Sequence, residues 1–158
     1  MANTQSMCTS FMGELMTATH NFGTAPIRAA STADTFKGAL YLASATINAS
    51  TTAYTVTGEV SGAGYSAGGV TVTNATPPTA TNSSATAGVA YWTPSASLTY
   101  TSVTLTTAFD AVLIYNSSQS NKAVSVHTFG SQTITAGTFT LTMPSNTTST
   151  ALLRLATT

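Results

Sequence analysis

The stretch A-F-D-A-V-L-I-Y at residues 108–115 is the only sustained, strongly apolar run in this chain of 158 residues. Val112, Leu113 and Ile114 follow one another without a polar residue, which is typical of a strand covered on both faces. Turn-rich and threonine-rich segments flank the run on either side. We therefore expect a central buried strand here, around which the rest of the chain is organised.

Short segments with alternating apolar and polar residues surround this run and predict a mainly β fold. The expected strands are 35–43, 54–60, 70–75, 88–93, 98–107, 108–115, 122–129, two pieces within 134–143, and 151–156. Gly130 and the pair Ala136-Gly137 are expected to interrupt the later strands, and Trp92 to anchor the core. A spacing of roughly 8–14 residues is typical of an antiparallel β-sandwich, and we expect the jelly-roll type.

One helix is expected at the N-terminus, over residues 4–19, because apolar residues recur there at helical spacing. The repeating residues are Cys8, Phe11, Met12, Leu15 and Met16. Gly23 and Pro26 follow and predict the end of the helix. We expect it to pack on the β core, with docking on a partner as the alternative. The chain is expected to form a single domain, with the helix and its turn at 1–23 and the β-sandwich at 34–158.

Charge is unusually scarce in this sequence. Charged residues make up 5% of the chain, with zero net charge, against about 25% in an ordinary globular domain. No basic field exists to hold phosphates, so neither a nucleic acid nor a membrane surface is expected as a partner. Neither a basic leader nor an apolar run of membrane-spanning length is present, so we expect a protein kept in the cytoplasm. A neutral, β-rich surface favours aggregation of a free monomer and suits a protein docked in an assembly.

The segment E-V-S-G-A-G-Y-S-A-G-G at 59–69 superficially resembles a dinucleotide-binding loop. Such a loop must open a helix, whose N-terminus holds the pyrophosphate. Here an alternating segment, V-T-V-T at 70–73, follows and indicates a strand. We therefore expect the glycines to allow positive φ angles and close backbone packing in an ordered loop.

Residue types that carry catalysis or bind metals are few and dispersed. They are Cys8, Glu14, His20, Asp34, Glu59, Asp110 and His127. Structural roles are expected for the histidines and the single cysteine, and a strand-edge hydrogen bond for Asp110. No nucleophile elbow, Walker loop or H-E-x-x-H motif is present. We predict no catalytic, cofactor-binding or metal site, and no enzyme activity.

Several segments occur together in a characteristic order along nearly the whole chain. They are S-F-M-G-E-L-M-T-A-T-H-N-F at 10–22, D-T-F-K-G-A-L-Y at 34–41, the glycine-rich segment at 59–69, F-D-A-V-L-I-Y at 109–115, and F-G…A-G-T-F-T-L at 129–141. This set resembles a widespread family of tailed-bacteriophage virion proteins. Members of such families are described as capsid cement, decoration, head-fibre or tail-associated proteins. The low charge and the threonine and serine richness of 75–107 depart from the family pattern.

The resemblance implies a cement or decoration protein that binds the outer surface of the major capsid protein as a dimer or trimer. Its place would be the virion, assembled in the cytoplasm of the host bacterium. Two alternatives remain: a tail, neck or fibre-associated protein, and a glycan-binding virion module. The glycan-binding alternative predicts an exposed aromatic platform from Tyr41, Tyr65, Tyr91 or Tyr100, whereas packing in the core or at an interface is the competing expectation for each.

Overall fold

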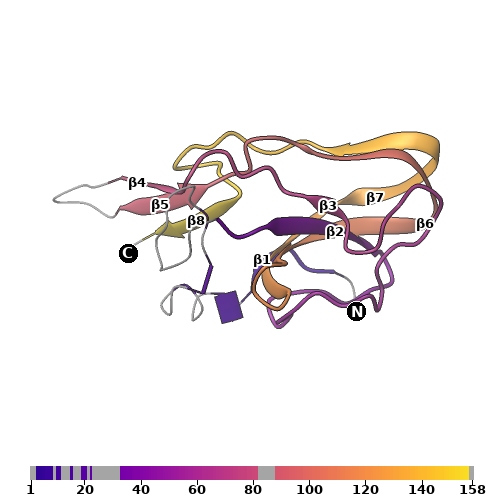
Figure 1. Ribbon diagram of the computed structural model, residues 1–158, viewed down its shortest axis with the longest axis horizontal. Coiled ribbons are helices and arrows are strands. Elements are labelled where there is room, and N and C mark those ends of the chain that lie inside the picture. Colours follow the sequence, from indigo (N-terminus) through magenta and orange to yellow (C-terminus); the bar gives the residue numbers. More distant parts are fainter. Residues whose placement is uncertain are drawn as a thin grey trace.

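The computed structural model describes residues 3–8, 10–11, 15, 19–20, 22, 33–81 and 88–156. This part of the chain is mainly β, with a five-stranded and a three-stranded antiparallel sheet (Figure 1). The strands are β1 (Ser6–Met7), β2 (Phe36–Leu42), β3 (Val70–Thr71), β4 (Thr79–Ala80), β5 (Val89–Trp92), β6 (Leu98–Asn116), β7 (Lys122–Leu141) and β8 (Leu153–Ala156). The large sheet has the order β1-β7-β6-β2-β3, and the small sheet, β4-β5-β8, lies at one end of the molecule.

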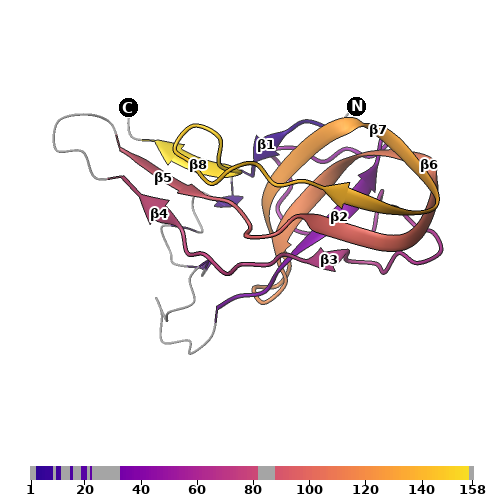
Figure 2. The same cartoon turned by 90° about the horizontal axis from the view of Figure 1, so that it is seen from above.

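Strands β6 and β7 form one long hairpin that bends back on itself (Figure 2). The pairing is irregular between Tyr100 and Ala111 of β6, and such bulges bend a ribbon while preserving most of its hydrogen bonds. Tyr100 pairs with Phe139 before the bend and Val112 with His127 after it, twelve residues further along each strand. The bend therefore costs the hairpin no net shift in register.

The bend places the first half of β6 over β2. The Tyr100 hydroxyl donates to the Gly38 carbonyl at 2.8 Å, and a Cβ atom at Gly38 would lie 2.6 Å from a methyl carbon of Leu98. Meanwhile β2 pairs edge to edge with the second half of β6, from Phe36–Asn116 to Leu42–Phe109. One strand thus contributes to both layers, and its first half covers one face of its second half.

The opposite face of the second half of β6 is covered by the segment 43–60 and by N-terminal residues. The ring of Tyr54 stacks on that of Tyr115 with 4.7 Å between centroids, and Ile47 is buried in the same core. All five residues of 111–115 are at most 2% exposed. The expected central strand, buried on both faces, is confirmed.

The two sheets meet at an aromatic cluster around Trp92 of β5. Its ring lies 4.8 Å from that of Phe22 and 6.3 Å from that of Phe36, measured between centroids. The indole N–H donates to the side-chain oxygen of Asn74 at 2.8 Å. Trp92 is 2% exposed, and its expected role as a core anchor is confirmed.

Several expected strand boundaries are wrong. The segments 98–107 and 108–115 form one strand, and 122–129 joins the pieces within 134–143 as another. Gly130 and Ala136-Gly137 do not interrupt β7, because register shifts take up the irregularity there without ending the pairing. The segment 54–60 is not a strand: it forms turns, with a single bridge between Glu59 and Tyr41.

The helix expected over 4–19 is not shown, and its first turn is wrong. Ser6–Met7 form β1, which pairs with Ser125 and Val126 of β7, and the Cys8 N–H donates to the Val124 carbonyl at 3.1 Å. The edge of β7 offers backbone partners that helical spacing cannot reveal. Much of the remainder, together with the expected end at Gly23 and Pro26, lies outside the described residues.

Substitutions at Ala136 test the bend. Ala136 lies in the bend with φ at +48°, a left-handed conformation that costs a residue with a Cβ atom about 1–2 kcal/mol. We expect Ala136→Val to lower the free energy of unfolding by about 1–2 kcal/mol, and Ala136→Gly to raise it by up to about 1 kcal/mol. Urea unfolding measures both, and Thr138→Val on the same exposed stretch is the control. Equal losses for Gly and Val at position 136 would contradict this account.

Candidate functional site

The most elaborate polar site among the described residues is centred on the Glu59 carboxylate, which is 8% exposed. One of its oxygens, Oε2, accepts a hydrogen bond from the Tyr54 hydroxyl at 2.7 Å. The other, Oε1, accepts from the Tyr65 hydroxyl and the Gly68 N–H, each at 2.7 Å. Hydrogen bonds to an ionised group are short and strong, and a buried charge needs such partners to offset its desolvation.

This network fastens the glycine-rich segment along the outer edge of β2. The Leu40 N–H donates to the Tyr65 hydroxyl at 3.0 Å, and the Leu40 carbonyl accepts from the Val60 N–H at 3.0 Å. The Leu42 N–H donates to the Gly58 carbonyl at 2.9 Å. Tyr65 therefore bridges the carboxylate and the strand, and the segment covers an edge that could otherwise pair with another chain.

The glycines of 59–69 behave as expected. Gly64, Gly68 and Gly69 have φ angles of +78°, +89° and +71°. A Cβ atom at Gly69 would lie 1.7 Å from the Gly38 carbonyl oxygen, and one at Gly62 would lie 2.0 Å from that of Thr104. The prediction of an ordered loop with positive φ angles and close backbone packing is confirmed, and neither distance could accommodate a larger residue.

The tyrosines around Glu59 remain neutral far into the alkaline range. Burial raises the pKa of Tyr41 to about 12, although a backbone hydrogen bond to Thr55 offsets part of the rise. Burial also raises the pKa of Tyr54 and Tyr65, and their hydrogen bonds to Glu59 add to the effect. The pKa of Tyr100 is raised by burial first and by the Glu59 charge second.

The positions of these tyrosines bear on the aromatic platform that glycan binding predicts. Tyr41 and Tyr100 are 0% and 2% exposed, so packing in the core is confirmed for both and the platform is wrong for them. The hydroxyl of Tyr65 is held by Glu59, and its ring stacks on that of Tyr100 with 6.0 Å between centroids. Tyr91 lies in the wall of an apolar cavity.

His20 belongs to a buried polar cluster with Asn116 and Asp34. The Asn116 side-chain nitrogen lies 3.0 Å from His20 Nδ1 and donates to Asp34 Oδ2 at 2.8 Å. Because an amide nitrogen only donates, Nδ1 is the acceptor and the neutral ring carries its proton on Nε2. The His20 ring also lies 4.8 Å from that of Phe11. The cluster joins the N-terminal part to the strand end, and its groups bond to one another.

The remaining candidates are placed in structural positions. His127 Nε2 lies 2.8 Å from Ser125 Oγ, and burial lowers the pKa of His127 to about 4, so the ring is neutral at physiological pH. Cys8 is buried. Asp110 accepts a hydrogen bond from the Asn3 side chain at 2.6 Å, which confirms its expected role. Glu14 lies outside the described residues.

Metal ligands and membrane spans can be assessed for the described ranges only. Within them, no group of three His, Cys, Asp or Glu residues could hold a metal ion. Likewise, none of the helices in that part of the chain is long and apolar enough to cross a membrane.

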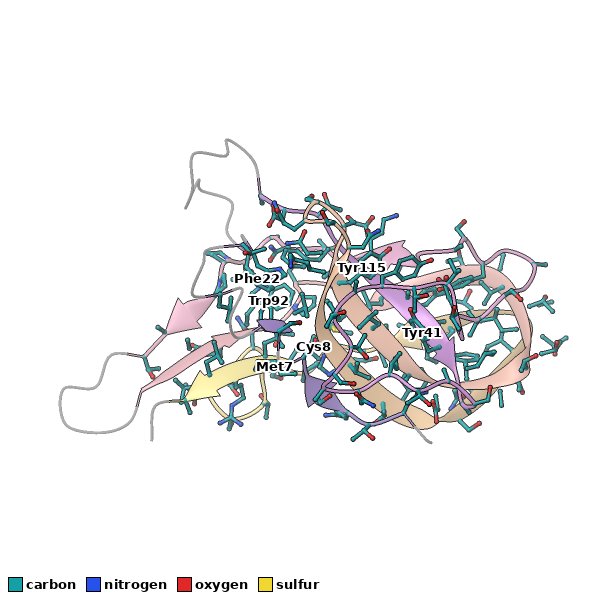
Figure 3. The ribbon with its side chains drawn as sticks, turned by 90° about the horizontal axis from the view of Figure 1, so that it is seen from below. Met7, Cys8, Phe22, Tyr41, Trp92 and Tyr115 are labelled. Atoms are coloured by element: carbon teal, nitrogen blue, oxygen red, sulfur yellow. The ribbon has the colours of Figure 1, made fainter. Side chains whose placement is uncertain are left out.

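Two cavities open on the described surface, and neither was anticipated from the sequence. The first, of about 80 Å³, lies where the small sheet meets the N-terminal residues (Figure 3). Its walls are apolar and include Met7, Phe11, Phe22, Tyr91, Trp92 and Leu155. The second, of about 160 Å³, has polar walls that include Tyr65, Ser66, Thr99 and Thr101. The wall residues of the first cavity come from distant parts of the chain, so no local motif marks it.

Comparison with known proteins yields no relative: no protein-family model, curated protein or solved structure matches this chain at a significant level.

Removing the Tyr65 hydroxyl tests whether the Glu59 network holds the loop to the sheet. We expect Tyr65→Phe to lower the free energy of unfolding by about 2–4 kcal/mol, because the buried carboxylate loses a donor and the Leu40 N–H loses its acceptor. Tyr91→Phe removes a hydroxyl outside this network and serves as the control, with a change within about 0.5 kcal/mol. Chemical denaturation measures both variants, and equal effects would show that the network adds no stability.

Alkaline titration tests the raised tyrosine pKa values. Tyrosines of an unfolded chain ionise near pH 10, whereas the buried ones hold their protons to higher pH. Above about pH 10 the folded state therefore binds more protons than the unfolded state, so stability falls as the pH rises. We expect phenolate absorbance and loss of β circular dichroism to appear together above that pH, with a shallower decline for Tyr41→Phe. Ionisation of most tyrosines in a still-folded protein would contradict this.

Proposed function

We propose that this chain is a structural protein of a tailed-bacteriophage virion, and that it acts as a capsid cement or decoration protein. It would bind the outer surface of the major capsid protein as a dimer or trimer and stabilise the head. The ordered set of segments that resembles phage virion proteins is the origin of this proposal. The observation that carries it furthest is the use of the buried polar groups, such as Glu59, in internal hydrogen bonds, which leaves the surface for contacts.

The character of that surface supports a contact role. Only four basic and four acidic residues occur in the chain, and two of the acidic residues, Asp34 and Glu59, are buried. The exposed positions of β6 and β7 carry mainly threonine and serine. Such a surface associates through apolar and backbone contacts, which bury area at symmetric interfaces and depend little on salt.

We further propose that the fold is a β-sandwich of the jelly-roll type, as many capsid-associated proteins have. Two antiparallel sheets of unequal size support this assignment. The long β6–β7 hairpin, which folds back over β2, is the kind of ribbon from which such a fold is built.

A tail, neck or fibre-associated protein is the alternative, and copy number separates the two. A cement protein is present in proportion to the many capsomers of the head, whereas a tail or neck component is present in a few copies per particle. Quantitative mass spectrometry of purified virions therefore decides between them. Absence of the chain from intact particles would refute both.

Removal of the protein from the particle tests the cement role directly. We expect heads assembled without it to release their DNA at a lower temperature, or at low salt, because the contacts that bridge neighbouring capsomers are lost. A fluorescent DNA dye monitors release during heating, and addition of the purified protein to deficient heads should restore the wild-type midpoint. Deficient heads as stable as the wild type would refute a cement function.

A further inference from the structure

Two large apolar side chains are strongly exposed on the described surface, and they lie in different settings. Val56 is 67% exposed and Leu155 is 41% exposed. Leu155 forms part of the wall of the apolar cavity beside the small sheet. Val56 instead stands alone, on the turn that leads into Glu59. An isolated exposed valine is ordinary by itself, so the argument depends on how the turn is built and on what could receive it.

The turn that carries Val56 is rigidly held. The Tyr41 hydroxyl, itself buried, donates to the Thr55 carbonyl and accepts from the Thr55 N–H at 3.3 Å. The Glu59 N–H donates to the Val56 carbonyl at 3.2 Å. On the far side of the turn, Glu59 is fixed by its three hydrogen bonds. An apolar group presented on a fixed backbone loses little entropy on binding, which favours its use as an anchor.

The apolar cavity has the size and chemistry to receive such a side chain. Roughly 10–15 Å³ of such space holds one water molecule, so the 80 Å³ of this cavity accommodates the three carbons of a valine side chain. Its walls, with Met7, Phe22, Trp92 and Leu153 among them, are apolar, so entry of a charged group would carry a desolvation cost. The sequence around Val56 has no charged residue from 38 to 58, and this neutrality matches the cavity.

We propose that Val56 of one copy of this chain inserts into the apolar cavity of a second copy. Figure 3 places Tyr41, which holds the turn, within the large sheet, and Met7, Phe22 and Trp92 at the junction with the small sheet. Anchor and cavity therefore lie on different parts of the molecule, and each copy can give one contact and receive one. Such a head-to-tail contact builds a closed ring. The inference stands on these two surfaces and does not depend on a place in the virion.

Two charged variants test the contact, each with a neighbouring control. Val56→Asp removes the anchor, and Leu155→Asp places a carboxylate at the cavity wall, in an exposed position that leaves folding intact. Thr57→Asp and Ala156→Asp put the same charge on exposed neighbours in the turn and in β8. Analytical ultracentrifugation at about 100 μM, far above a Kd of about 1 μM, should show an oligomer for the wild type and both controls, and monomer for V56D and L155D.

Mixing the two variants identifies the contact as head to tail. V56D keeps an intact cavity and L155D keeps an intact anchor, so an equimolar mixture should form one-to-one dimers and no larger species, as native mass spectrometry can show. A monomeric wild type would overturn the proposal. So would a wild-type oligomer that V56D leaves intact, or a mixture that stays monomeric. Circular dichroism melting of each variant distinguishes loss of the contact from loss of the fold.

Discussion

The antiparallel pairing of β2 with the second half of β6 is the contact on which the other layers depend. It joins Phe36–Leu42 to the central apolar run, and residues 111–115 are buried on both faces there. Strands buried on both faces need a cover on each side. The same hairpin provides one cover by bending back over β2, and the segment 43–60 provides the other. Full burial of each large aliphatic side chain contributes about 1.5–3 kcal/mol, so this strand pair is the natural centre of stability.

A chain with so few charges must protect its sheet edges by other means. Natural sheets often place lysine or proline on an exposed edge to prevent pairing with other chains. Here the glycine-rich segment occupies the outer edge of β2 beyond β3, and it is fixed by the Glu59 carboxylate. On the other side, β1 pairs with β7 only at Ser125 and Val126. Beyond that point, register shifts bend β7, and a bent, irregular edge is a poor template for a second strand.

The parts of the fold that could be predicted are those encoded locally. Val112, Leu113 and Ile114 identify the central strand by composition alone, and the glycines of 59–69 identify a loop because a strand pattern follows them. The parts that could not be predicted depend on partners distant in sequence. Ser6–Met7 lie in a segment with helical spacing but pair with β7, because the backbone partners there are more than a hundred residues away.

The same distinction applies to the polar sites. Glu59 lies close in sequence to Tyr54 and Tyr65, so the network around it carries a faint local signal: a lone carboxylate between two tyrosines. The cluster of His20, Asn116 and Asp34 carries none, because its members come from three separate segments. In both sites the ionisable groups are bonded to neighbouring side chains in the interior. A protein that commits its scarce ionisable groups to holding its own loops and strands together retains hydroxyls, methyl groups and an apolar cavity for contacts with other molecules. That distribution of chemistry favours function through association, since a surface of this kind discriminates partners by shape and by apolar fit rather than by charge.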